Sequence, residues 1–179
     1  MSQKLLERIA SGALSRQDLA RLRANALPLA ERGDEGAKAV LEALEANAVP
    51  SDRYILFMGF CPSADFDNRL DIGWRAESVC YYRNSKDTSG QLERFQSMLR
   101  GDLIVLKKRH EFGKTMQLFG HGRVRGIRGG QYRDLDVDWS PQTEVITVPL
   151  LGCNSTVDVR SLAQVDAEMP ETFYAWLKA

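Results

Sequence analysis

The chain of 179 residues has few cysteines, few histidines and no long apolar run. Its three cysteines, Cys61, Cys80 and Cys153, are odd in number and widely separated, which argues against a disulfide framework and against a zinc motif. We expect reduced thiols, mostly in the core. No apolar stretch approaches membrane-spanning length, and the first residues lack the apolar segment of a signal peptide. A soluble, cytoplasmic protein without a cofactor is therefore expected.

Net charge is absent too, because 24 Lys and Arg balance 24 Asp and Glu, but the charges are unevenly distributed. Residues 81–133 hold twelve basic and four acidic side chains, whereas residues 134–179 hold two basic and eight acidic ones. A clustered basic segment in a neutral protein predicts a polyanionic partner such as RNA or DNA. The alternative is that the acidic C-terminal segment covers the basic strands and cancels their field.

Aromatic residues are missing from residues 1–50, which we interpret as a helical appendage of about three short helices. Ser15 with Asp18 resembles a capping box, and Pro28 is expected to interrupt the helical pattern. The segment has no net charge and no cluster of His, Cys or paired acids. It is therefore expected to be a cap or a protein-binding element. A DNA-reading helix-turn-helix is the less favoured alternative, suggested by Arg16, Arg21 and Arg23.

Residues 51–179 alternate between short apolar runs and turn signals, which indicates one α+β domain. The run at 54–60 is apolar almost throughout and predicts a buried central strand. Within 99–139, a Gly-Asp step, a basic turn and a Gly129–Gly130 turn separate three runs, as in consecutive antiparallel strands. Further elements are expected as strands at 79–84 and 144–150, helices over about 92–99 and beyond Ser161, and a loop over 61–73.

One order of features in this domain resembles a known family. Trp74 is followed by YYRN at 81–84, a helix through Met98, GDLIVLKK at 101–108 and LFGHGRVRGI at 118–127. Over residues 54–150 this order is similar to the PUA-like superfamily, and within it to the EVE domain and its relative, the YTH domain. The chain differs where Lys107, Lys108 and Arg109 replace a Tyr-His pair of that family.

The resemblance implies a small, mostly antiparallel β-barrel with flanking helices that binds nucleic acid and accepts a modified base in an aromatic pocket. Unstacking a base costs free energy that ring stacking and hydrogen bonds to the base edge return. The candidate pocket residues are Tyr54, Trp74, Tyr81, Tyr82, Asn84, Asp102 and Trp139. The candidate phosphate contacts are Arg83, Lys107, Lys108, Arg109, Lys114, Arg123 and Arg125. Joint replacement of Lys107 and Arg109 by Glu is expected to weaken binding without unfolding the protein.

Several of these residues also have a purely structural interpretation. Trp139 fits a core position, and Arg83 fits a cross-strand pair with an acid of the 134–138 run. His121 lies between two glycines, where backbone passes close to a neighbour, but it has no acid or nucleophile partner that would make a catalytic site.

Two other function classes stay open. Asp134, Asp136 and Asp138 alternate onto one strand face and would suit a metal-dependent nuclease, although their spacing is wide for one ion. A non-catalytic regulatory subunit that binds a partner through residues 1–50 is the other. A calcium loop at Asp65, Asp67 and Asn68 is rejected, because Leu70 and Ala76 occupy the positions that an EF-hand gives to glycine and glutamate.

Overall fold

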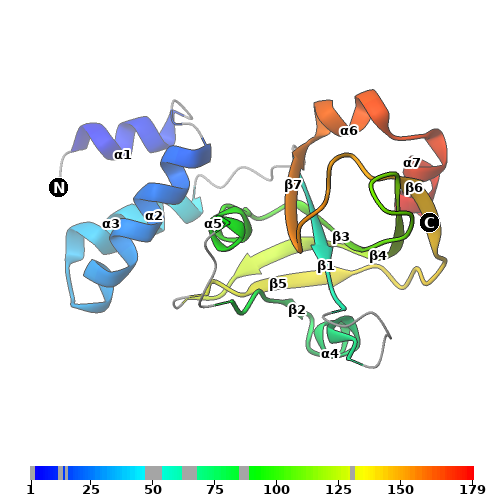
Figure 1. Cartoon of the computed structure of the whole chain (residues 1–179). Coiled ribbons are helices and arrows are strands. Elements are labelled where there is room, and N and C mark those ends of the chain that lie inside the picture. Colours follow the sequence, from blue (N-terminus) through cyan, green and yellow to red (C-terminus); the bar gives the residue numbers. More distant parts are fainter. Residues whose placement is uncertain are drawn as a thin grey trace. The chain divides into compact units, whose positions relative to one another are not determined.

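The computed structural model describes residues 3–11, 14, 16–46, 54–61, 68–84, 89–129 and 132–179. The chain divides into two compact units, residues 1–49 and 50–179. The expected boundary near residue 50, Ser15 and the Asp65 and Asp67 positions lie outside the described residues. Within the described part, seven helices and a seven-stranded mixed sheet make an α+β protein (Figure 1). None of the described helices combines the length and apolarity needed to cross a membrane.

The first unit, called here the helical unit, holds α1 (Gln3–Ala10), α2 (Arg16–Glu31) and α3 (Glu35–Ala46). Pro28 was expected to interrupt α2, and this was wrong, because the helix continues to Glu31. A proline one turn before a helix end removes only one intrahelical hydrogen bond. Gly33 then takes a positive φ of 90°, and the Asp34 carboxylate accepts a 2.8 Å hydrogen bond from the Ala37 amide. These two residues end α2 and begin α3.

The second unit, called the sheet unit, is built on strands in the order β2-β5-β4-β3-β1-β7, with β6 paired to β4 (Figure 1). Among the described strands, β1 and β3 pair in parallel and the other five pairings are antiparallel. The described strands form an open sheet, so the expected closure into a barrel is not confirmed. The strands are β1 (Tyr54–Gly59), β2 (Val79–Cys80), β3 (Leu103–Arg109), β4 (Thr115–Ile127), β5 (Leu135–Trp139), β6 (Ile146–Pro149) and β7 (Val157–Ser161).

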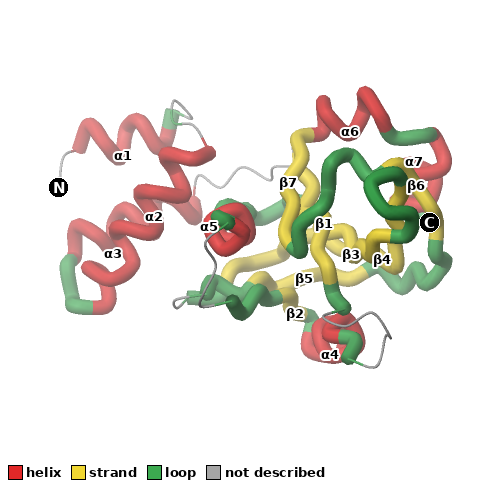
Figure 2. Tube along the Cα trace, viewed as in Figure 1, coloured by secondary structure: helices red, strands yellow, loops and turns green. Residues whose placement is uncertain are grey.

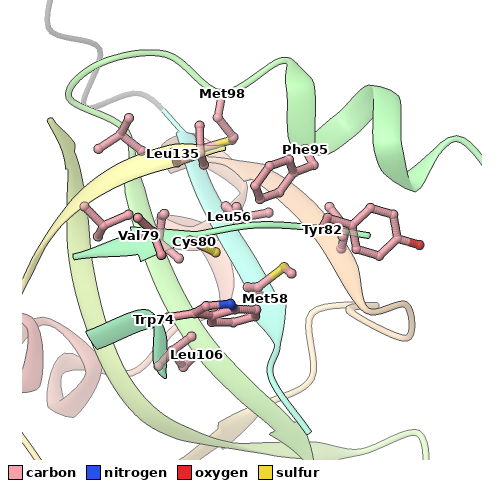
Figure 3. Close-up of a cluster of buried hydrophobic side chains, with 14 of the residues drawn as sticks. Leu56, Met58, Trp74, Val79, Cys80, Tyr82, Phe95, Met98, Leu106 and Leu135 are labelled. Carbon is pink, nitrogen blue, oxygen red and sulfur yellow. The ribbon is translucent and has the colours of Figure 1, made fainter. Parts of the chain in front are cut away.

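Both faces of β1 are buried, as its apolar run predicts. The strand is interior but not central, because it lies between β3 and the edge strand β7. Leu56 and Met58 join one cluster, which α4 (Leu70–Glu77) and α5 (Gln91–Gln96) complete through Trp74 and Phe95. Figure 3 shows Trp74 beside Met58 in this cluster. Ile55 and Phe57 point to the other face, because successive strand residues alternate. There the cluster is completed by α6 (Leu162–Glu168) and α7 (Glu171–Lys178).

Three elements differ from the sequence-based expectation. The strand expected at 79–84 is only Val79–Cys80. The segment expected as a loop contains α4, visible in Figure 2 as a short helix between β1 and β2. Gly73 inside it and its mixture of charges hide the helical pattern. The strand β7 was not expected because Asp158 and Arg160 interrupt its apolar run, and both charges are satisfied internally.

Candidate functional site

The Gly101–Asp102 step is a structural turn. Gly101 takes a positive φ of 93°, and its amide donates a 2.8 Å hydrogen bond to the carbonyl of Val124. The Asp102 carboxylate is fully buried and accepts a 2.8 Å hydrogen bond from the Leu99 amide. The conformation at Gly101 favours glycine, which explains the Gly-Asp pair. Asp102 therefore ties the segment after α5 to β3 and is not placed to read the edge of a base.

Two of the expected stacking platforms hold the sheet unit together instead. Trp74 on α4 is completely buried. The Trp139 indole donates to the carbonyls of Trp74 at 3.1 Å and Val79 at 3.3 Å. A β-carbon on Gly122 would lie 2.9 Å from the Trp139 ring, so that glycine makes room for the indole. Trp139 thus joins α4 to β5, in agreement with its structural interpretation.

Two more predicted pocket residues, Tyr82 and Asn84, lie together, and a third, Tyr54, lies at the start of β1. Tyr82 is buried against Phe95, with 6.3 Å between ring centroids. Its hydroxyl accepts a 3.3 Å hydrogen bond from the side chain of Asn84, which is exposed. Tyr54 begins β1, four residues before Met58 and so about 13 Å along the strand from it. The structure therefore does not assemble the seven predicted residues into one pocket.

Lys107 is 3% exposed and lies inside the sheet unit. Its ammonium group donates to the carbonyls of Cys153 and Ser155 and to the Asp158 carboxylate, the last at 2.9 Å. An ammonium has three N–H donors, and all three are used. Lys107 therefore has none left for a phosphate. The expectation that Lys107→Glu leaves the fold intact is corrected accordingly, since the change would bury two carboxylates side by side.

The remaining basic residues divide between the two ends of the β3–β4 hairpin. Arg109 pairs in register with Met116, whereas Arg123 pairs with Leu103, six residues or about 20 Å along β3. Arg123 donates a 2.6 Å hydrogen bond to the Gly101 carbonyl and pairs in register with Asp138 on β5. Arg125 lies beside Arg123 on β4 and is exposed, whereas Lys108 and Lys114 lie with Arg109 at the other end.

The turn between β3 and β4 carries the most exposed large apolar side chain recorded among the described residues. Phe112 is 90% exposed, and Arg109, His110 and Lys114 around it are exposed as well. We call these four residues the hairpin tip. From the sequence, only the charge of this turn was expected to matter. The signal that could have identified it is the phenylalanine in KKRHEFGK at 107–114, where one exposed acid, Glu111, stands among basic residues.

A second arrangement surrounds the guanidinium of Arg83, at the other end of β4. The group lies over two rings, 4.7 Å from the centroid of Tyr81 and 4.8 Å from that of Tyr132. Both of its terminal nitrogens donate to the carboxylate of Asp134, which raises the pKa of Arg83 above its ordinary value. We call Tyr81, Tyr132 and Asp134 the guanidinium site. Tyr132 was missed from the sequence because it stands in a turn, outside any strand pattern.

The acidic strand face is largely paired with arginine. Asp134 binds Arg83, and Asp136 accepts a 2.8 Å hydrogen bond from Arg128. The cross-strand interpretation of Arg83 is therefore confirmed. No group of three or more His, Cys, Asp or Glu that could hold a metal ion occurs among the residues with described positions.

His121, Cys80 and Cys153 are buried side chains. The His121 ring is buried with its edge toward Trp176, at 4.8 Å between centroids. Burial lowers its pKa, the backbone of Trp176 raises it, and the charge of Arg75 lowers it. The three cysteines form no disulfide with one another. Burial raises the pKa of Cys80, and that of Cys153 to about 11.

No family model, curated protein or solved structure matches the chain. The likeness to EVE domains consequently rests on the order of motifs in the sequence.

Proposed function

We propose that this chain is a non-catalytic nucleic-acid-binding protein that contacts RNA or DNA through the hairpin tip. The observation that carries the proposal is the 90% exposure of Phe112 amid Arg109, His110 and Lys114. A phenyl ring held in water stacks on any unpaired base, because every base has a π face, and the neighbouring cations bind phosphate. An aromatic ring within a basic turn is the combination that single-stranded nucleic acid requires.

We also propose kinship with the PUA-like superfamily, closest to its EVE and YTH domains. The support is the order of Trp74, the YYRN segment at 81–84 and the Gly101–Asp102 step before β3. A small barrel is part of that proposal, and it implies closure beyond the open sheet of the described strands. Recognition of a modified base belongs to the same proposal, with Tyr81 and Asn84 as the predicted pocket residues outside the core.

A metal-dependent nuclease is less well supported. Arg83 and Arg128 already neutralise Asp134 and Asp136, so the expected metal-binding face is engaged in ion pairs. Binding of a protein partner through residues 1–50, and a cytoplasmic location, stay expectations from the sequence.

The test is binding of fluorescent single-stranded RNA and DNA, with and without methylated bases, at about 50 and 200 mM salt. The double change Arg109→Glu with Lys114→Glu should lower the affinity for the oligonucleotides at least tenfold. It should also reduce, by about two, the slope of the logarithm of the affinity against the logarithm of the salt concentration. Phe112→Ala should weaken binding at both salt concentrations, because stacking is not screened. Lys178→Glu, a charge reversal at an exposed site on α7, is the matched control. A wild-type protein that binds no oligonucleotide at the lower salt would overturn the proposal.

A further inference from the structure

We propose that the guanidinium site takes a guanine base in exchange for Arg83, with preference for guanine methylated at N7. This inference rests on the proposed function, since it names the base that the protein would read. It arises from what now occupies the site, a planar cation stacked on two tyrosines and bonded through two parallel N–H groups to one carboxylate.

The donor pattern selects guanine among the bases. A carboxylate only accepts hydrogen bonds, so a base paired with Asp134 must offer two donors side by side. The Watson–Crick edge of guanine offers N1–H and the 2-amino group in the same spacing as the two nitrogens of a guanidinium. Adenine and cytosine each place an acceptor beside the donor, and uracil and thymine flank their one donor with carbonyls. Those four bases would set lone pairs against the Asp134 oxygens.

The charge and the rings select the methylated form. Tyr81 and Tyr132 present electron-rich faces to a cation, and a positively charged group is favoured there over a neutral one. Methylation at N7 makes guanine cationic and leaves both donors of its Watson–Crick edge in place. N7-methylguanine therefore reproduces the shape, charge and hydrogen bonds of the group that it would replace.

The surroundings permit the exchange. The Arg83 side chain is 43% exposed and Asp134 23%, so the pair lies at the surface and solvent screens it. Tyr81 is fixed from behind by Trp74, with 5.5 Å between the ring centroids, and keeps its place when Arg83 leaves. The displaced guanidinium is then available for the phosphate of the same nucleotide, which is the contact first expected of Arg83.

The experiment uses nucleosides, so that phosphate contacts do not enter, and the full-length chain followed by NMR titration. Arg83→Ala should bind 7-methylguanosine at least tenfold more tightly than the wild type does, because the competing group is gone. That variant should bind guanosine more weakly than 7-methylguanosine, and inosine, which lacks the 2-amino group, more weakly than guanosine. Adding Asp134→Asn to Arg83→Ala should abolish binding. Arg128→Ala, which removes a comparably exposed pair with Asp136, is the matched control and should bind as the wild type does.

Three results would overturn the inference. The first is equal binding of adenosine and 7-methylguanosine by Arg83→Ala, and the second is no binding of either nucleoside. The third is binding of N-acetylarginine amide in place of the nucleosides, which would indicate a protein ligand. Each variant is checked for an unchanged unfolding midpoint. Failure at this site with intact, salt-dependent oligonucleotide binding at the hairpin tip overturns only the guanine assignment. If the protein binds neither the nucleosides at the guanidinium site nor the oligonucleotides at the hairpin tip, the proposed function is overturned as well.

Discussion

The buried ion pair of Lys107 and Asp158 should be among the most sensitive positions of the sheet unit. Lys107→Ala leaves the Asp158 carboxylate buried, with the Ser155 amide still donating to it at 2.9 Å. We expect a loss of about 3 to 5 kcal/mol in the free energy of unfolding, measured in urea. The pair Lys107→Met with Asp158→Leu should recover most of it, and Arg109→Ala should change stability by less than about 0.5 kcal/mol. A mild effect of Lys107→Ala would contradict the burial of this charge.

His121 should make the stability depend on pH near neutrality. Burial lowers its pKa in the folded state, so the unfolded chain binds the proton more tightly. The contribution of neutral His121 to the free energy of unfolding is complete above the ordinary histidine pKa of about 6.5. It is lost as the pH falls below that value, by about 1.4 kcal/mol for each unit by which folding lowers the pKa. We therefore expect urea midpoints to fall between about pH 7.5 and 5.5, and to fall less in His121→Gln. Equal slopes in the wild type and in His121→Gln would refute this assignment.

At the level of single side chains, the sequence predicted residue type better than residue role. Lys107, Lys108 and Arg109 look alike in a basic run, yet one is buried, one half-buried and one exposed. Lys107 is the buried one because its ammonium meets the carbonyls of Cys153 and Ser155 and the Asp158 carboxylate. These partners lie 46 to 51 residues further along the chain, so they leave no mark in the basic run itself.

Two glycines should respond in opposite ways to the same added methyl group. Gly73 lies within α4, and a β-carbon there would meet no heavy atom within 4 Å. Gly73→Ala should therefore stabilise the protein by about 0.5 to 1 kcal/mol through helix propensity. A β-carbon on Gly122 would lie 2.6 Å from Val137 and 2.8 Å from the Asp138 carbonyl, so Gly122→Ala should destabilise by about 1 to 3 kcal/mol. Thermal unfolding of the two variants measures both signs, and a stable Gly122→Ala protein would refute the tight packing of β4 on β5.

Among the elements, those with an uninterrupted pattern were predictable. The apolar run at 54–60 and the alternating LDVDW run became β1 and β5, and the segment after Gly101 became β3. The parallel pairing of β1 with β3 was not expected, because nothing in either strand encodes its neighbour. The helix α4 and the strand β7 were missed for a related reason. Arg75 of α4 and Asp158 of β7 bind partners far away in the sequence, the carbonyl of Ser140 and the ammonium of Lys107.

The two units bury separate cores, and the unfolding of the sheet unit can be followed without attaching a fluorescent label. All tyrosine, tryptophan and phenylalanine residues of the chain lie beyond residue 50, so intrinsic fluorescence reports only on the sheet unit. We expect the fragment 50–179 to show the fluorescence unfolding midpoint and the oligonucleotide affinity of the full chain. The isolated helical unit, with few buried residues, should be only marginally stable. A lower midpoint for the fragment would show that the two cores depend on each other.

The place of β1 in the sheet has a consequence for the order of events during synthesis. Its neighbour on one side is β3, but its neighbour on the other side is β7, about a hundred residues further along the chain. At about 5 to 20 residues per second, ribosomes need roughly 5 to 20 s to deliver that second partner. Throughout this delay one edge of an almost wholly apolar strand has no native neighbour. The nascent chain is therefore most prone to aggregation before its last strand emerges, and chaperone binding should concentrate on the YILFMG segment during that interval.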